Sequence, residues 1–271
     1  MSQYASGSHV TPSGQKFLLG LPRSSEILRS AIPRMASSVI PASEIPDWDH
    51  WPSQLKVLDQ NGYNGCTHYS STQGLMFARL QSGQPHAQLE PLYSYSVATG
   101  GWNVGTSILD AAAQIAKVGI CEVGQIPASL ANPRSFSAKA VANALRFRFE
   151  IDQQLNSWEE VQSEAGGRRR AVILAIQVGN TYSNLDSEGC MGVDRGPGNH
   201  AILIAGGKKT LRNGKPALRH CGSWSRAWGQ NGFGWYKEDH WNATGYQEAY
   251  TIKAVIEDPS DADTPPIALA I

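Results

Sequence analysis

The sequence predicts an α+β protein in which a helical lobe packs on an antiparallel sheet or barrel and leaves a groove between them. Helix signals come first along the chain. After Gly167 they give way to short runs rich in β-branched and aromatic residues. The 271 residues, 41% of them hydrophobic, are enough to bury a substantial core in one large domain or two closely joined lobes.

Three segments in the first part of the chain carry helix signals. The first follows Cys66, where apolar and aromatic residues fall at helical spacing up to a stop at Gly83, so one face is expected to be buried. The other two are TSILDAAAQIAKVG and SWEEVQSEAGG, which are capped at Ser107 and Ser157, each with an acidic residue three positions later. The glycines that follow these runs end the helices.

The second part of the chain contains short runs typical of β-strands. They are AVILAIQV, HAILIAGG, ALRHCGSW, GFGWYK and AYTIKAVIE. Turns rich in Gly, Asn and Pro separate them. Helices followed by strands in this way favour the segregated α+β arrangement.

The two ends of the chain are predicted to lie outside the folded domain. Residues 1–45 are rich in Ser, Pro and Gly and are predicted to form an extended N-terminal arm, and residues 257–271 a C-terminal tail. The N-terminus lacks the features of a secretion signal, and no stretch approaches the roughly 18 apolar residues of a membrane span. The protein is therefore expected in the cytoplasm or assembled into a larger particle, with the arms available to protein partners.

Charge and cysteine spacing exclude several classes of partner. Lys plus Arg and Asp plus Glu both total 23, so no net positive field is present to hold a nucleic acid. The run from Arg168 to Arg170 is interpreted as a solvated turn. The four cysteines form no CxxC pair, so no metal site is expected, and Cys190 and Cys221 are either a pair or core residues.

The stretch DQNGYNGCTHYSS, residues 59–71, places Cys66 at the start of the first predicted helix. Unpaired N–H groups and the positive end of the helix dipole lower the pKa of a thiol there, as a nucleophile requires. His200, which opens HAILIAGG, could supply the base from the second lobe, and Gln60 could donate to an oxyanion. The alternative is that Cys66 is a small buried hydrophobic residue.

Several blocks of the sequence resemble, in the right order, the papain-like cysteine peptidases, especially bacterial-type members with threonine after the nucleophile. DQNGYNGCT resembles the glutamine-to-cysteine motif, GPGNHAILIAGG the histidine strand, and GSWSRAWGQNGFGWYK the Trp-rich strand and turn. The separation of Cys66 and His200 falls within the about 130 to 150 residues typical of the family. The resemblance covers roughly residues 46–256.

The resemblance implies a papain-like fold with a helical lobe at about residues 46–166, a β lobe at about 167–256 and the active cleft between them. It implies Cys66 as nucleophile, His200 as general base and acid, and the Gln60 side chain with the Cys66 N–H as oxyanion hole. No cofactor is implied. The implied substrate-binding residues are Trp224, which shields the histidine, Trp228 on the leaving-group side, and Gly100, Gly101 and Gly105, which line the cleft.

One position departs from the family pattern. The orienting asparagine that precedes the Ser-Trp pair is replaced by Gly222. The task of that asparagine is to hold the imidazole in the useful tautomer, which a backbone carbonyl, a water or Ser223 could do less well.

The leading function is therefore hydrolysis of peptide bonds in a peptide or protein substrate through a Cys-His acyl-enzyme. The alternative is a catalytically weakened or inactive papain-fold protein that serves as a structural or binding component of a larger assembly. Acyl transfer to an amine instead of water would use the same site.

Overall fold

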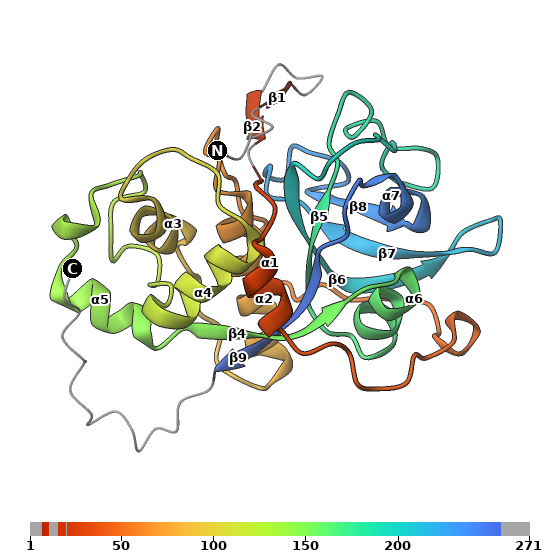
Figure 1. Ribbon diagram of the computed structural model, residues 1–271, viewed down its shortest axis with the longest axis horizontal. Coiled ribbons are helices and arrows are strands. Elements are labelled where there is room, and N and C mark those ends of the chain that lie inside the picture. Colours follow the sequence, from red (N-terminus) through yellow and green to blue (C-terminus); the bar gives the residue numbers. More distant parts are fainter. Residues whose placement is uncertain (1–6, 11–15, 20, 256–271) are drawn as a thin grey trace.

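The computed structural model describes residues 7–10, 16–19 and 21–255, and these form two lobes that lie side by side (Figure 1). One lobe consists of helices and the other is built around an antiparallel sheet, which confirms the predicted fold class. We refer to the contact region between the lobes as the seam. Within the described ranges no helix is long and apolar enough to cross a membrane.

The first lobe is arranged around one long helix, α2. The helices of this lobe are α2 (Cys66–Gln81), α3 (Pro91–Thr99), α4 (Ile108–Val118) and α5 (Ala138–Leu145), with a 3-10 turn at Pro133–Ser135. α2 contacts α3 and α4 on one side and strands of the sheet on the other. It therefore lies at the seam and belongs to the packing of both lobes.

α2 is buried on all sides at its N-terminal end. Every residue from Cys66 to Phe77 is buried. The single buried face expected from the apolar spacing is therefore wrong, because both lobes cover this helix. Two of its hydroxyl groups donate to the helix's own backbone, Ser70 Oγ to Cys66 O at 2.7 Å and Thr72 Oγ1 to His68 O at 2.6 Å, which satisfies these two without water.

α4 has the cap and the stop that its sequence predicts. Ser107 Oγ accepts a hydrogen bond from the Asp110 N–H at 3.1 Å, and Gly119 ends the helix with a φ of 71°. A Cβ at Gly119 would lie 1.9 Å from the carbonyl oxygen of Ala144 in α5. Only glycine fits this close approach between the two helices.

The second lobe contains a seven-stranded sheet in the order β4-β9-β5-β6-β7-β8, with β3 paired to β6. The strands are β3 (Trp48–Asp49), β4 (Arg148–Leu155), β5 (Val172–Ile176), β6 (His200–Thr210), β7 (Pro216–Cys221), β8 (Phe233–Lys237) and β9 (Ala249–Val255). β5 to β9 correspond to the five predicted runs. β3 and β4 were not predicted, and because both precede residue 167 the sheet begins earlier in the chain than the predicted lobe boundary.

Side chains that alternate along the strands fill two cores on opposite faces of the sheet. On the face toward α2, Leu203 of β6 packs in one cluster with Leu75 and Phe77. On the other face Ile202 and Leu218 pack in a second cluster. This second face is covered by α6 (Trp158–Val161), the π-helical turn Gln162–Gly167 and α7 (Glu238–Ala243).

The arginine run after the π-helical turn surrounds a buried carboxylate. The Glu164 side chain is fully buried and pairs with Arg168 and Arg170, each at 3.1 Å. Arg169 lies over the Trp48 ring at 4.9 Å. The solvated turn predicted from the sequence is therefore wrong, because a buried carboxylate needs cations beside it.

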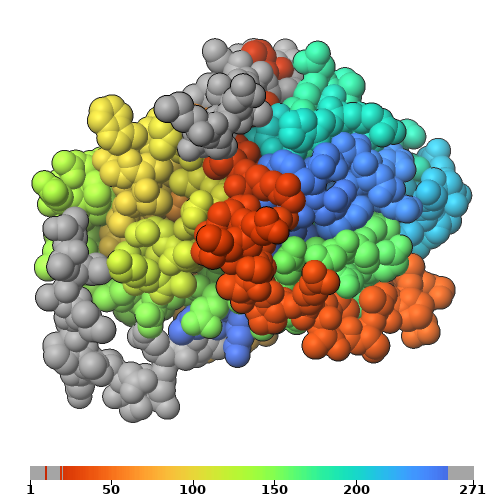
Figure 2. Space-filling view, in the orientation of Figure 1, coloured from red at the N-terminus to blue at the C-terminus, as the bar shows by residue number. Residues whose placement is uncertain are grey.

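The N-terminal arm contains short elements and joins both lobes. β1 (Gly7–Val10) pairs with β2 (Lys16–Leu19), α1 (Glu26–Ala31) begins after the cap Ser25, and a 3-10 turn covers Ala42–Glu44. In Figure 2 the red segment lies across the seam, between the yellow helical lobe and the blue strands. The extended arm predicted for residues 1–45 therefore holds local structure. The predicted tail, residues 257–271, lies outside the described residues.

The cysteines do not form a disulfide. All four are free and buried. Cys190 and Cys221 lie in different hydrophobic clusters, so the structure decides the pairing that the sequence left open in favour of two core residues.

Candidate active site

Cys66 is the first residue of α2, as the sequence predicts. Gly65 precedes it, and a Cβ at Gly65 would lie 3.2 Å from the rings of Tyr69 and Tyr95, so the turn into the helix is packed against aromatic side chains. The Cys66 side chain faces the second lobe, where its Sγ accepts a hydrogen bond from the Ala201 N–H at 3.4 Å. The residue is only 1% exposed.

His200 is the first residue of β6 and is fully buried. Asn199, directly before it, fixes the entry to the strand, because its side chain accepts from the Val178 N–H and donates to the Val178 carbonyl, both at 2.9 Å. The imidazole lies against the Trp224 ring with 5.1 Å between centroids. Its position is therefore set by the backbone on one side and by an indole on the other.

The structure brings these two residues together from different lobes. The Cys66 sulfur lies at the peptide bond between His200 and Ala201, because it accepts a hydrogen bond from the N–H of that peptide. Ala201 shares a core cluster with Cys66, and the His200 ring contacts Trp224 of a second cluster.

Burial sets the protonation of the thiol. It raises the pKa of Cys66 to about 11, and the backbone N–H groups of Ala201, Thr67 and Cys66 itself, which favour the thiolate, offset only part of that rise. The lowered pKa expected from the helix N-terminus is therefore not found in this closed arrangement. Below pH 9 the sulfur is a neutral thiol.

Gln60 is held rigidly across the seam. Its backbone N–H donates to the Ser223 carbonyl at 2.8 Å, its Oε1 accepts from the Ser223 hydroxyl at 2.6 Å, and its Nε2 donates to the Tyr63 carbonyl at 2.7 Å. The glutamine is fully buried. Ser223, considered above as an orienting residue for the imidazole, uses its hydroxyl to fix the glutamine.

The Trp228 ring lies against Gly222. A Cβ at Gly222 would lie 3.2 Å from Cε3 of Trp228, closer than an ordinary van der Waals contact. Trp228 is 3% exposed and belongs to the core cluster of the β lobe. The indole therefore packs inward, and its place on the leaving-group side of a groove stays a prediction.

Tyr182 is a residue of the site that the sequence did not reveal. It is 1% exposed, and its hydroxyl is hydrogen bonded to Nε2 of His220 at 2.6 Å. Its ring is at the centre of an aromatic cluster with His200, His220, Trp224 and Trp228. The loop before β6 that carries Tyr182 shows no periodicity or motif, so no signal in the sequence pointed to it.

The three glycines predicted to line the cleft lie between α3 and α4, and their contact with a substrate stays a prediction. Gly100 ends α3 with a φ of 65°. A Cβ at Gly101 would lie 2.7 Å from the Ala131 carbonyl oxygen, so this residue faces the helical lobe. Gly105 adjoins Thr106, whose hydroxyl is hydrogen bonded to Thr67 at 2.6 Å. Only the end of this loop therefore reaches the start of α2.

The segment Leu21–Ser24 closes the seam at the site. The Leu21 N–H donates to the carbonyl of Asn199, the residue before the histidine, at 3.3 Å. Ser24 donates from its N–H and its hydroxyl to the two carboxylate oxygens of Glu248, each at 2.8 Å, and its Oγ accepts from the Leu109 N–H at 3.3 Å. Ser24 thus connects the start of α4 with the strand side of the seam.

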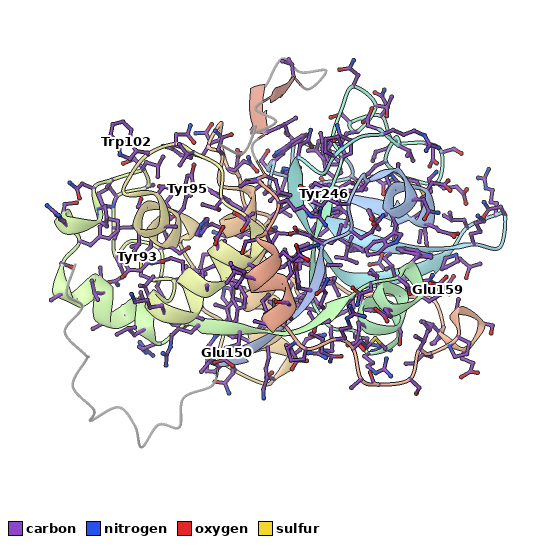
Figure 3. The ribbon with its side chains drawn as sticks, in the orientation of Figure 1. Tyr93, Tyr95, Trp102, Glu150, Glu159 and Tyr246 are labelled. Atoms are coloured by element: carbon purple, nitrogen blue, oxygen red, sulfur yellow. The ribbon has the colours of Figure 1, made fainter. Side chains whose placement is uncertain are left out.

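Two tyrosines flank the same region. Tyr246 donates to the Gly198 carbonyl at 2.7 Å, and Tyr95 donates to the Val104 carbonyl at 2.9 Å. Figure 3 labels them on opposite sides of the seam. Burial is the main reason that the pKa of both tyrosines is raised, and the nearby Cys66 contributes to both shifts.

The remaining polar groups do not suggest another centre. Among the residues that the structure describes, no group of three or more His, Cys, Asp and Glu side chains could hold a metal ion. A surface pocket beside Asp47, Lys208 and Thr210 contains none of the site residues, and its polar groups bond one another.

Comparison with known proteins gives matches in structure only. No family-level sequence profile matches the chain, and no curated protein matches it in sequence. Xylellain, a cysteine protease from Xylella fastidiosa, is 18% identical, with a TM-score of 0.61 over 94% of this chain and 97% of that chain. Digestive procathepsin L 3 of the Tenebrio molitor larval midgut is 19% identical, with a TM-score of 0.62 over 84% of this chain and 75% of that chain.

A further match has a similar TM-score at lower identity. Procathepsin B S9 from Trypanosoma congolense is 14% identical, with a TM-score of 0.61 over 86% of both chains. The chain therefore has the papain-like fold over most of its length. Sequence identity this low supports the fold alone, and any assignment of chemistry depends on the side chains of the site.

Proposed function

We propose that the protein is a papain-like cysteine peptidase that hydrolyses peptide bonds in peptide or protein substrates. The observation that carries this proposal is the 3.4 Å contact between Cys66 Sγ and the Ala201 N–H, which puts a thiol from the first lobe at the peptide following His200. The papain-like fold supports the same assignment, because its cysteine protease members share this architecture.

In the proposed reaction the His200 imidazole takes the Cys66 proton, and the thiolate attacks the carbonyl carbon of the substrate peptide. The oxyanion accepts hydrogen bonds from the Gln60 amide and the Cys66 N–H. The intermediate then expels the amine, which takes the proton from His200, and leaves a thioester on Cys66. Water that gives a proton to His200 hydrolyses the thioester, releases the acid and restores the thiol.

In the proposed reaction, substrate entry requires a movement at the seam, because Cys66 is only 1% exposed. The segment Leu21–Ser24 is the part we expect to move, since Leu21 lies in the core cluster of Cys66 and its N–H donates to Asn199, beside the histidine. Displacement of the segment would admit water and so remove part of the desolvation that raises the thiol pKa. The closed arrangement is therefore a resting form of the proposed enzyme.

The second candidate function is an inactive papain-fold component of a larger assembly. Two observations favour it: Gly222 offers no side chain to orient the imidazole, and the pKa of Cys66 is raised to about 11. Loss of the orienting aspartate in Ser-His-Asp enzymes lowers kcat by about four orders of magnitude.

Turnover of a mixed peptide library separates the two candidates. The full chain, Cys66→Ala and Cys121→Ala are compared, each also in a Glu248→Ala background that loosens the closing segment. Cys121 is a buried free cysteine in the cluster around Tyr93 and serves as the matched control. New peptide termini are expected with the full chain and Cys121→Ala but not with Cys66→Ala. Equal background in all samples would overturn the peptidase assignment.

A further inference from the structure

A second polar pair lies beside the His200 ring. The Tyr182 hydroxyl and Nε2 of His220 are 2.6 Å apart, and both residues are fully or almost fully buried. We propose that Tyr182, tethered by His220, is the positioning residue for the His200 imidazole in this chain. The inference rests on the proposed peptidase function. It assigns to this pair the orientation of the imidazole, because Gly222 has no side chain that could do so.

The room beside Gly222 is already occupied. Trp228 Cε3 would lie 3.2 Å and Cζ3 3.5 Å from a Cβ at that position, so a longer side chain would collide with the indole. The Trp228 ring in turn stacks on Tyr182, with 4.9 Å between centroids and 24° between planes. The glycine, the indole and the tyrosine therefore pack together, and a side chain at residue 222 would require the Trp228 ring to shift by a few tenths of an ångström.

Tyr182 contacts every other ring of the cluster. Its centroid lies 5.0 Å from that of Trp224 and 6.2 Å from that of His200, at interplanar angles of 78° and 72°. Trp224 covers another part of the imidazole, at 5.1 Å and 45°. Rotation of the imidazole about its Cβ–Cγ bond would press it into one of these two rings, so their placement fixes its orientation.

The hydrogen bond to His220 keeps Tyr182 in place. His220 lies inside the sheet, paired with Ile204 of β6 and Gly234 of β8, so its ring has a rigid support. Burial and then the neighbouring His200 lower the pKa of His220 to about 3, which leaves this second imidazole neutral above that pH. A neutral ring can serve as a hydrogen-bond partner to tyrosine without adding a charge beside His200.

The first test reads His200 directly and requires no turnover. In a Cys66→Ala background, ¹⁵N-detected imidazole spectra of the full chain are compared with those of Tyr182→Phe and Tyr236→Phe, and His200 is assigned with His200→Gln. Tyr236 lies in the same core cluster, and its hydroxyl has no hydrogen-bond partner among the described residues, so it is the matched control. We expect one set of His200 ring signals in the control and broadened or doubled signals in Tyr182→Phe. Identical spectra would overturn the proposal.

The second test measures peptide hydrolysis. Tyr182→Phe and His220→Leu are each expected to lower kcat about tenfold with KM within about twofold, as expected when a reacting group loses its orientation and binding is intact. His220→Gln, which keeps a partner for the Tyr182 hydroxyl, should restore most of kcat, and the Tyr182→Phe/His220→Leu double variant should lose no more than either single one. Additive losses, or kcat equal to that of Tyr236→Phe, would overturn the inference. If the full chain cleaves no peptide, the peptidase proposal fails, and the spectra still decide the role of Tyr182.

Discussion

The two sides of the site are built in different ways. The nucleophile side consists of Gln60 and Cys66, which lie close together in the sequence and are held by hydrogen bonds to backbone and to Ser223. The histidine side is an aromatic cluster around His200, assembled from the loop before β6, from β7 and from the turn after it. One side depends on a local motif, whereas the other depends on packing that only the complete fold produces.

The largest expected effect on peptide hydrolysis comes from a substitution that removes the imidazole of the histidine side and leaves the thiol in place. His200→Ala is expected to lower peptide hydrolysis by about a thousandfold, because the proposed general base is lost. Initial rates on one cleaved peptide, with circular dichroism as a check of folding, measure this. Activity within about threefold of the full chain would show that the aromatic cluster has no role in the chemistry.

The next effect concerns the protonation of the nucleophile side. Because burial raises the pKa of Cys66 from 9.0 to about 11, the folded state holds the thiol proton more tightly than the unfolded chain. The resulting stability is fully present below pH 9 and is lost as the pH rises through 11. The free energy of unfolding of the full chain relative to Cys66→Ala should therefore fall by up to about 3 kcal/mol between pH 8 and pH 12. Parallel curves in urea titrations would contradict this.

Loosening the closing segment should expose the thiol without touching either side of the site. Glu248→Ala removes both acceptors of Ser24 and is expected to raise the rate of Cys66 alkylation by iodoacetamide at pH 8 about tenfold or more. Glu150→Ala, at an exposed glutamate of β4, is the control. Equal rates in the two variants would mean that other contacts keep the seam closed.

Replacing Gly222 with asparagine tests whether the histidine side has room for the orienting residue of the family pattern. Gly222→Asn is expected to destabilise the fold by about 2 kcal/mol, because the new Cβ would press on the Trp228 ring. Trp228→Leu should relieve part of that cost in the double variant. Urea unfolding of the full chain, the two single variants and the double variant gives the coupling free energy between residues 222 and 228. A Gly222→Asn variant as stable as the full chain would show that the site can accommodate the asparagine.

The smallest effect lies on the nucleophile side. Ser223→Ala removes the hydroxyl that donates to Gln60 Oε1 and is expected to cost about 1 kcal/mol in stability with a severalfold loss of kcat. Ser225→Ala, which removes a hydroxyl two residues further along, is the matched control. Equal stability and turnover in the two variants would show that the backbone alone fixes the glutamine.

The sequence was sufficient for the parts of the fold that have a period or a motif. The capping pair at Ser107, the five strand runs after Gly167 and the Cys66 helix start were all predicted. β4 was not predicted although Phe147, Phe149 and Ile151 alternate there, since it falls within the range expected for the helical lobe. The apolar periodicity also predicted only one buried face for α2, because the spacing of apolar residues contains no information about a second lobe that covers the other side.

The candidate site was predictable only where its residues belong to a motif. Gln60, Cys66 and His200 could be proposed from the sequence, but Tyr182 and the Ser24–Glu248 contact join segments far apart in the chain and of no distinctive composition. The buried pairing of Arg168 with Glu164 was missed for the same reason, since charge in a sequence does not show what it faces.

The position of α2 has a consequence for how the protein folds. Leu75 and Phe77 of this helix pack in one cluster with Ile173 and Leu203 of the sheet, so the two lobes share this cluster. Neither half of the chain would retain it if the polypeptide were divided between them. Denaturation is therefore expected to be one cooperative, two-state transition for the whole domain, despite its bilobal appearance.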